Sequence, residues 1–529
     1  MELLRARAAA PASTGPDTKP GGPKLADAIA GVSMALVLIP QALAYAGVAG
    51  MPAHTGLYAA ALGPLAAAFF ASSPYLQTGP TALTALIAAG VLAEHAAPGS
   101  ALYVALASVL AVIAGLIRIS IGALRGGRLV FLMSEPVVRG FTAAAALLII
   151  ASQIPAALGV AAGGHGPLAD AVAALSRPDA WAPQAPLLTL LTIAVVLGAR
   201  RLHPLVPGAL VATVGGAVYG ATGNYRGPTL GSIPQGLPGL TLDLPWGAAP
   251  SLLFGGVVIA VVGFSEAASI ARVYAARERQ RWDPDREFIS QGIANIAAGL
   301  GGAFPVGGSF SRSSLAHMLG ARTRWSGAFT GLAVLVFLPF ASALSTLPLA
   351  VLAGVVIAAV GGLLRLGPLA SIWAVSRAQF GVALTTYTLT LALSPRIEQG
   401  VLLGILIAIV VHLWREFKVR VDAWIEGDAL HVRPRGVLWF GSAEELKDVV
   451  LELVAAYPEA KRLVMRMGRL GHVDFTAALA IEDVVRRVRE AGLEVTFVNV
   501  HPVTARSLRA VLARMPNPPE ILATTPGDR

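Results

Sequence analysis

Sixty-six consecutive residues near the start of the chain, between Asp27 and Glu94, carry no formal charge. A helix that crosses the hydrocarbon core of a bilayer needs about 20 predominantly apolar residues. Proline-containing segments at 52–55 and 72–74 divide the uncharged stretch into three apolar parts. The stretch therefore predicts three successive membrane spans.

The charged residues divide the chain into a membrane part and a soluble part. Of 529 residues, 13% are charged, whereas soluble domains average about 25%. Residues 418–529 hold 16 Lys/Arg and 15 Asp/Glu, but the much longer stretch 1–417 holds only 24 and 15. We therefore expect a cytoplasmic N-terminal segment at 1–24, a transmembrane transport domain at 25–417 and a soluble domain at 418–529.

Several function classes are excluded by what the sequence lacks. The chain has no cysteine, which excludes disulfides and thiolate metal sites, and its nine histidines show no metal-ligand spacing. No phosphate-binding loop that would power ATP-driven pumping is present. We expect no enzyme, no cofactor and no metal site, so any uphill transport would be secondary.

Apolar segments recur along the whole transport domain. After the first three, a fourth lies at 94–118 and a fifth, broken near Glu135, Pro136 and Arg139, extends to 164. An i, i+4 ion pair is the expected role of Glu135 and Arg139. Nine further segments lie near 187–199, 204–220, 250–271, 288–303, 309–320, 326–341, 348–364, 370–393 and 397–414. The sequence thus predicts an α-helical polytopic membrane protein with fourteen spans.

The basic residues provide an independent test of this topology, because cytoplasmic loops are enriched in Lys and Arg. If the N-terminus is cytoplasmic, three arginines fall in odd-numbered loops, namely Arg177, Arg226 and Arg396. Twelve fall in even-numbered loops: Arg118, Arg125, Arg128, Arg200, Arg201, Arg277, Arg279, Arg281, Arg286, Arg322, Arg324 and Arg365. This distribution predicts an even number of spans with both termini in the cytoplasm. From the sequence as a whole, we expect this multi-pass protein in the inner membrane. Because the basic residues are scattered over loops, no nucleic-acid partner is expected.

Two apolar segments begin with turn chemistry where a full span would be expected. The first, at 77–83, reads QTGPTAL, where Pro80 suits a first helical turn and Thr78 is a candidate cap. The second, at 304–312, reads FPVGGSFSR and is followed by only nine uncharged residues. Short, Gly/Pro-interrupted segments at corresponding positions of two halves indicate the binding site of a secondary transporter. The spacing predicts a seven-plus-seven inverted repeat.

A series of short motifs, in order along the chain, resembles the sulfate permease (SulP) family, to which pendrin and prestin are related. The motifs are LIPQALAYA at 38–46, GLY at 56–58, TGP at 78–80, GFT at 140–142, IPQGLP at 233–238, GFSE at 263–266 and FPVGGSFSR at 304–312. The C-terminal segment is similar to the STAS domain of that family. The resemblance implies core and gate subdomains, homodimers, and transport of small anions such as sulfate, bicarbonate, chloride or dicarboxylates.

The two short helices suggest how an anion would be held. A helix N-terminus offers free N–H groups and a partial positive charge of about half an electron, and Arg312 adds a full charge. Gln41 and Tyr45, four residues apart, share one face of the first span. The predicted substrate-binding residues are Gln41, Tyr45, Thr78, Gly79, Thr81, Gly308, Ser309, Phe310, Ser311 and Arg312. The alternatives are that the hydroxyls only cap helices, that Phe310 only packs, that Gln41 only makes an interhelical hydrogen bond, and that Arg312 pairs with a carboxylate or reaches an interface.

Glu266 lies well inside the predicted span at 250–271, where a charged side chain is costly. It can act as a proton carrier, a cation ligand or a structural partner of Arg312. The resemblance implies an ion-coupling role, with protons favoured over sodium.

The tail from about residue 426 changes to the pattern of a small α/β domain. Short strands are predicted at 429–433 and 437–440, joined by a turn at 434–436, with further strands at 463–467 and 495–500 and helices at 477–490 and 504–514. Thr476 stands where related domains have a phosphorylatable serine, and simple N-capping is its expected role.

Together these features predict a secondary active transporter, with proton-coupled symport of a small anion by alternating access and a regulatory or structural STAS domain. Three rivals remain: an uncoupled exchanger, channel or voltage-driven motor; a membrane sensor with STAS output; and a nucleobase permease.

Overall fold

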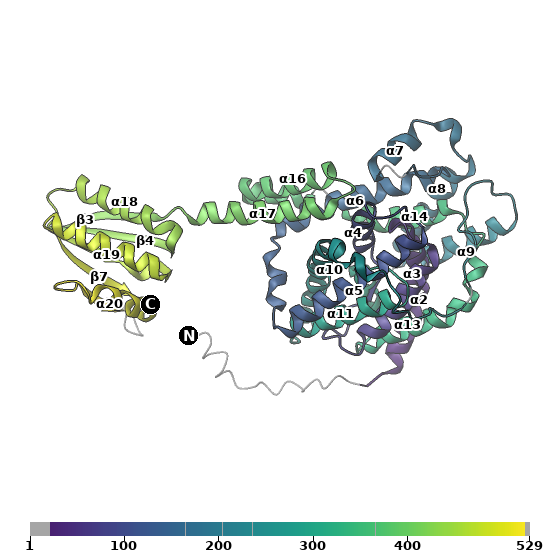
Figure 1. Cartoon of the computed structure of the whole chain (residues 1–529), viewed down its shortest axis with the longest axis horizontal. Helices are drawn as coiled ribbons and strands as arrows, with labels where there is room; N and C mark the ends of the chain where they lie inside the picture. Colours follow the sequence, from purple (N-terminus) through teal and green to yellow (C-terminus); the bar gives the residue numbers. More distant parts are fainter. Residues whose placement is uncertain (1–21, 164–165, 204, 235, 365–366, 524–529) are drawn as a thin grey trace. The chain divides into compact units, whose positions relative to one another are not determined.

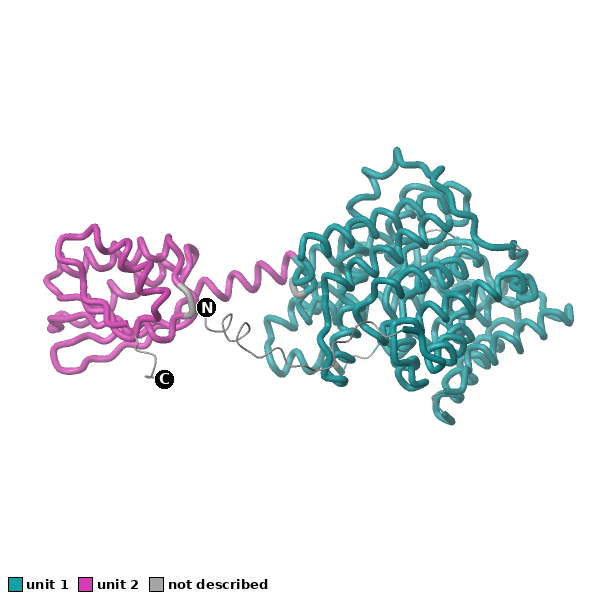
Figure 2. Tube along the Cα trace, turned by 90° about the horizontal axis from the view of Figure 1, so that it is seen from below, with its two compact units in different colours: residues 1–405 teal, residues 406–529 magenta. Residues whose placement is uncertain are grey.

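A computed structural model describes residues 22–163, 166–203, 205–234, 236–364 and 367–523. Most of the expected N-terminal segment, residues 1–21, lies outside this range, as does Arg365. The contacts divide the chain into two compact units, Met1–Ile405 and Leu406–Arg529 (Figure 2).

One helix of the described residues lies at each of the fourteen expected spans (Figure 1). These helices are α2 (Leu25–Val48), α3 (Ala53–Ala67), α4 (Ala82–Leu92), α5 (Ala101–Ala123), α6 (Glu135–Leu158), α8 (Gln184–Leu202), α9 (Gly208–Ala221), α10 (Ala249–Arg277), α11 (Pro284–Leu300), α12 (Phe310–Met318), α13 (Trp325–Phe337), α14 (Leu349–Val360), α16 (Arg377–Ala392) and α17 (Ile397–Glu416). Two further helices, α7 (Pro167–Leu175) and α15 (Gly367–Val375), lie between them. By length and composition alone, seven helices in the described part of the chain can cross a membrane.

Helix contacts repeat with an offset of seven spans, as an inverted repeat requires. In the first half α5 packs against α10 and α11, and in the second half α13 packs against α2 and α3. Likewise α6 packs against α16, and its counterpart α14 packs against α8. The contacts form two groups, which we call the core (α2–α5 and α10–α13) and the gate (α6–α9, α14 and α16). The predicted fold class is therefore confirmed.

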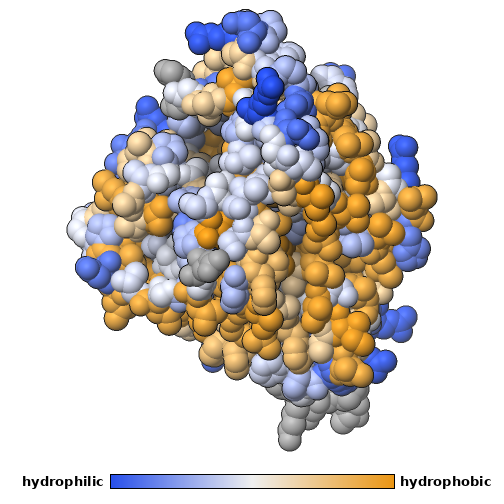
Figure 3. All heavy atoms as spheres, turned by 90° about the vertical axis from the view of Figure 1, so that its right-hand side faces the viewer, coloured by the Kyte–Doolittle hydropathy of each residue, from blue (hydrophilic) through white to orange (hydrophobic). Residues whose placement is uncertain are grey.

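Large apolar side chains are exposed on the outer helices of the transport unit. On α9, Val211, Val214 and Val218 are exposed at helical spacing, and α8 exposes Leu187, Leu190 and Leu191. In Figure 3 hydrophobic side chains form a broad belt across the face shown, with hydrophilic ones mainly at its upper end and margins. Helices that are apolar on their outward side are what a lipid environment requires.

Buried carboxylates fix the loops that lead into the core helices. Glu287 of α11 accepts hydrogen bonds from the backbone N–H groups of Ser72 (3.1 Å) and Ser73 (2.8 Å). Asp27 of α2 accepts them from the N–H groups of Arg322 (2.7 Å) and Thr323 (2.9 Å). Both carboxylates are fully buried, so each one holds a connecting segment against a helix distant in sequence.

Two expectations about the fourth and fifth spans were wrong. Arg118, assigned to a loop, lies within α5 and is fully buried, because it bonds to the backbone of other core segments. The fifth span is not broken near Glu135: α6 runs unbroken from Glu135 because Pro136 occupies its first turn, where no intrahelical N–H bond is lost. The expected ion pair between Glu135 and Arg139 is confirmed at 2.8 Å.

The second unit is a mixed sheet with helices. Its strand order is β3-β4-β5-β7-β8, with β6 pairing to β4; β3 and β4 are antiparallel and the other pairs are parallel. Its elements are β3 (Arg420–Glu426), β4 (Ala429–Leu438), α18 (Phe440–Ala456), β5 (Arg462–Arg466), β6 (Leu470–Val473), α19 (Phe475–Glu490), β7 (Glu494–Val500), α20 (Pro502–Leu512) and β8 (Glu520–Ala523). Leu446, Ile481 and Leu508 of the three helices pack with Leu463 and Phe497 of the strands in one core.

Several details of this unit differ from expectation, and strands β3, β6 and β8 were not predicted. The predicted turn at 434–436 is part of one continuous strand, β4, because the unpredicted strand β3 pairs along its length and Asp422 of β3 binds both Arg433 and Arg435. Helix α18 was not predicted. Thr476 is not the N-cap of α19, since the carboxylate of Asp474 accepts the hydrogen bond from the N–H of Ala477 at 2.7 Å.

We expect Gly56→Val to destabilise the transport unit. A Cβ atom at Gly56 would lie 2.0 Å from the carbonyl oxygen of Ala42, so α2 and α3 cannot stay in contact. Overpacking of this kind costs about 1–3 kcal/mol. The temperature at which half of the purified protein loses its monodisperse peak should fall by several degrees. Gly47→Val is the control, because a Cβ there meets no atom within 4 Å; equal stability of the two variants would contradict the prediction.

Candidate functional site

A two-residue strand pair brings the amino ends of the two short helices together. Strand β1 (Thr78–Gly79) leads into α4, and β2 (Gly307–Gly308) leads into α12. The two strands are antiparallel, with Thr78 opposite Gly308 and Gly79 opposite Gly307. Because α4 and α12 have only 11 and 9 residues, each begins well inside the protein rather than at a membrane surface.

Each short helix has a hydroxyl cap within two residues of the end of its strand. The Thr81 hydroxyl accepts a hydrogen bond from the N–H of Thr84 at 3.3 Å, and the Ser309 hydroxyl accepts one from the N–H of Arg312 at 3.5 Å. The expectation that Thr78 caps α4 was wrong, because its hydroxyl accepts a hydrogen bond from Gln291 Nε2 of α11 at 2.7 Å. The remaining N–H groups of both first turns keep their partial positive charge.

A cavity of about 370 Å³ adjoins these helix ends, between the core and the gate. Eight of the eleven predicted substrate and coupling residues line it: Gln41, Tyr45, Thr81, Glu266, Ser309, Phe310, Ser311 and Arg312. Thr78, Gly79 and Gly308 do not line it; they form the strand pair behind the helix ends. The structure therefore gathers side chains from α2, α4, α10 and α12 around one space.

Arg312 is the buried cation at the short-helix end of this cavity, and most of its donors have no protein partner. The side chain is only 2% exposed, and its Nη1 donates to Gln41 Oε1 at 3.4 Å. Its Nε and Nη2 have no hydrogen-bond acceptor within the described chain. An unpaired buried donor costs free energy, and more when it is charged. The guanidinium is therefore poised to bind an acceptor that the protein does not supply.

The approach to Arg312 depends on a glycine. Gly79 has a φ of 149°, a backbone conformation that side-chain-bearing residues rarely adopt. A Cβ there would lie 3.4 Å from Arg312 Nη2. Glycine thus lets β1 turn directly beside the guanidinium.

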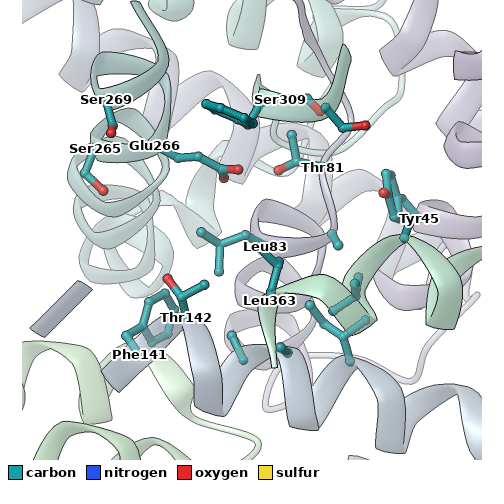
Figure 4. Close-up of a pocket in the computed structure, with 18 of the residues that line it drawn as sticks. Tyr45, Thr81, Leu83, Phe141, Thr142, Ser265, Glu266, Ser269, Ser309 and Leu363 are labelled. Atoms are coloured by element: carbon teal, nitrogen blue, oxygen red, sulfur yellow. The ribbon is translucent and has the colours of Figure 1, made fainter. Parts of the chain in front are cut away.

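Glu266 faces the same cavity from α10. Figure 4 shows its carboxylate pointing towards Thr81, with Ser309 nearby and Tyr45 on the opposite side of the cavity. Among the described residues it makes no ion pair with Arg312 within 4.0 Å, although both line one cavity. The alternative of a direct structural ion pair therefore has no contact to support it in this conformation.

Several residues that line this cavity were not predicted from the sequence. Ser265 and Ser269 of α10 and Arg200 of α8 line it, as do Phe141 and Thr142 of α6. Phe141 and Thr142 belong to the GFT motif at 140–142, and Ser269 lies one helical turn after Glu266, so these positions carried a signal. Arg200 was assigned to a loop, and only the fold places it beside the cavity.

The site has the chemistry of an anion receptor with one ionisable acid. Two helix N-termini, unpaired guanidinium N–H groups and hydroxyl donors all favour negative charge. The volume is at the low end of ligand pockets, which suits a small ion with some of its water. No group of three or more metal-ligating side chains occurs in the described ranges.

Comparison with known proteins identifies the families that both parts of the chain match. The model of the sulfate permease family matches residues 25–386, and that of the STAS domain matches residues 420–513. A probable sulfate transporter of Mycobacterium tuberculosis is 30% identical over 516 residues, with 92% of this chain and 90% of the relative covered.

Two solved structures show the same arrangement. The murine Solute Carrier 26 family member A9 anion transporter superposes with a TM-score of 0.86 at 17% identity, covering 94% of this chain and 88% of that one. The transmembrane domain of the cyanobacterial bicarbonate transporter BicA gives 0.63 at 26% identity, covering 73% and 97%.

Proposed function

The chain belongs to the sulfate permease family and is an anion transporter, not an enzyme, and from this premise we propose that it is a proton-coupled symporter of sulfate, bicarbonate or a small dicarboxylate. Its similarity to a probable sulfate transporter and to a bicarbonate transporter supports this substrate class. The anion binds between the amino ends of α4 and α12.

The observation that carries the proposal is the unpaired guanidinium of Arg312 at the junction of two helix N-termini. Its Nε and Nη2 atoms lack acceptors in the described chain, and the side chain is buried. A transported oxyanion supplies those acceptors. The Thr81 and Ser309 hydroxyls and the nearby N–H groups complete its coordination, while Gln41 holds Nη1.

Glu266 couples the anion to a proton. In its charged form the carboxylate would repel an anion in the same cavity, and in its protonated form it would not. Proton uptake by Glu266 therefore favours anion binding, and the two are carried together. Sodium in place of the proton is the alternative for the same residue.

Alternating access requires the substrate to lie between two bodies that move relative to each other. The core supplies the two short helices α4 and α12, which we call the half-helices, together with Arg312 and Glu266. The gate supplies Phe141, Thr142 and Arg200 on the other side of the cavity. Movement of the core against the gate would expose the site to each aqueous side in turn. The protein acts in the inner membrane as a homodimer with cytoplasmic termini, and the STAS domain has a regulatory or structural role.

Uptake by the full-length protein in liposomes tests this function. Labelled sulfate, bicarbonate, chloride and a dicarboxylate are supplied with and without imposed proton or sodium gradients. With the membrane potential held at zero, we expect an inward proton gradient to drive accumulation by about tenfold per pH unit for the one proton that Glu266 carries, because one pH unit corresponds to about 1.4 kcal/mol. Gradient-independent exchange or chloride currents would identify an uncoupled exchanger or channel, and binding without flux would identify a sensor.

A further inference from the structure

A second arginine lies behind the anion cavity, within the core. Arg118 of α5 is fully buried. Its Nε donates to the carbonyl of Ala260 at 3.2 Å, Nη2 to that of Ile259 at 2.8 Å, and Nη1 to that of Val306 at 3.1 Å. The first two acceptors lie on α10, the helix of Glu266, and Val306 directly precedes β2. One guanidinium thus ties together the two segments that present Glu266 and Arg312.

The strand that Arg118 holds is fixed from a second side. Asn295 of α11 donates from Nδ2 to the carbonyl of Val306 and accepts the N–H of Val306 at Oδ1, both at 3.0 Å. Gln291, one turn earlier, donates to Thr78 Oγ1 of β1. The strand pair below the anion site is therefore held by polar side chains of α5 and α11.

The position of Arg118 requires glycine on the facing helix. A Cβ at Gly263 of α10 would lie 2.7 Å from Arg118 Nη2 and 3.2 Å from Thr84 Cγ2, and Thr84 belongs to the first turn of α4. The same Thr84 methyl lies 3.2 Å from the Cβ position of Gly307 in β2. The guanidinium of Arg118 thus lies next to Gly263, which lies next to Thr84 in the first turn of α4. Thr84 in turn lies next to Gly307 of β2, the strand that leads into α12.

The charge of Arg118 is not balanced by a neighbouring acid. Within the described ranges it makes no ion pair with Asp or Glu, and all three of its bonds are to uncharged carbonyl groups. A buried arginine is expensive, yet hydrogen bonding to three carbonyls needs only donors and not a charge. An anion bound in the neighbouring cavity would supply the negative charge that the surrounding residues do not.

We infer that Arg118 is a positioning and specificity-determining residue of the anion site: it sets β2 against α10, and its charge favours doubly charged anions over singly charged ones. This inference rests on the proposed function. Within the core, Arg312 and Arg118 place two positive charges near the ends of the short helices, and Arg200 of the gate adds a third on the other side of the cavity, against the single acid Glu266. With Glu266 protonated, this excess of positive charge favours a dianion over a monoanion. The Coulomb energy between Arg118 and the bound anion is proportional to the charge of the anion. Removing the charge of Arg118 should therefore weaken the binding of a dianion by the square of the factor by which it weakens the binding of a monoanion.

The test compares two competitors of similar shape and different charge. Full-length protein in liposomes takes up whichever labelled anion it transports, and unlabelled sulfate and methanesulfonate compete. We expect R118M to raise the inhibition constant of methanesulfonate about fivefold and that of sulfate about 25-fold. R118K keeps the charge, so it should lose affinity for both anions equally and preserve their ratio.

The outcomes separate the charge of Arg118 from a purely structural role. Equal losses for both competitors in R118M, or identical ratios in R118M and R118K, would overturn the inference. Failure of sulfate to compete in the wild type would overturn it too. If R118M does not give a monodisperse protein, R118Q, whose amide still donates to a carbonyl, takes its place with the same expected ratio. Absence of any wild-type uptake would instead count against the proposed function.

Discussion

Replacing Arg312 with glutamine should abolish saturable anion uptake and weaken sulfate binding by at least about 100-fold. The substitution removes the charge of Arg312 and two buried donor nitrogens, Nε and Nη2, that have no acceptor in the described chain. Hydrogen bonds to charged groups contribute about 1.5–3 kcal/mol each, so losing two costs about 3–6 kcal/mol of binding free energy. Sulfate binding by the purified protein measures the loss directly.

The effect must come from the site and not from misfolding. Arg312→Lys keeps the charge but not the planar pair of donors, so its affinity should lie between those of wild type and Arg312→Gln. Arg177→Gln serves as the matched control, because Arg177 is exposed and does not line the cavity. Saturable sulfate binding of wild-type affinity in Arg312→Gln would remove Arg312 from the anion site.

The half-helices were predictable because their signals are local. Gly79, Pro80 and Thr81 in one half, and Gly308 and Ser309 in the other, have the chemistry that begins a helix, and the apolar segments after them are too short to span. The pairing of β1 with β2 could not be predicted from local signals, because it joins residues more than 200 positions apart. That pairing leaves Thr81, and not Thr78, at the N-cap of α4 and turns Thr78 towards Gln291.

The charged residues were harder to interpret from the sequence alone. Arg118 looked like a loop arginine because it closes an apolar segment, and its three carbonyl acceptors come from segments about 140 to 190 residues later. The residues that the gate contributes to the cavity could likewise not be predicted, because tertiary contacts place them there. Arg200 and Thr142 reach the site only because α6 and α8 pack beside the half-helices, which local periodicity does not encode.

In the second unit, too, local signals predicted some elements correctly, while tertiary pairing determined others. Helix α19 has strong amphipathic spacing and was predicted within two residues of its observed start. The Pro434 region has the composition of a turn, yet it pairs with Val421 of β3 as a regular strand position. A proline lacks the N–H for one ladder bond but leaves the neighbouring pairs intact, so tertiary pairing overrides the local signal.

Glu266→Gln should uncouple anion transport from the proton gradient and leave exchange intact. Glutamine has nearly the same shape as glutamic acid and is always neutral, so the site keeps the charge of its anion-binding form but cannot take up or release a proton. In liposomes with an imposed pH difference, accumulation should fall from about tenfold per pH unit to none. The free energy of proton entry, about 1.4 kcal/mol per pH unit, is then no longer coupled to anion uptake. Exchange of labelled for unlabelled sulfate at equal pH should continue.

Glu135→Gln is the matched control for this variant. Glu135 is exposed and pairs with Arg139 outside the cavity, so its neutralisation should leave accumulation unchanged. Full gradient-driven accumulation by Glu266→Gln would show that another group carries the proton. Loss of exchange as well as accumulation, in a protein that still binds sulfate, would assign Glu266 to the movement between core and gate and would equally contradict a role in coupling. The two measurements together therefore distinguish a proton carrier from a residue that only shapes the cavity.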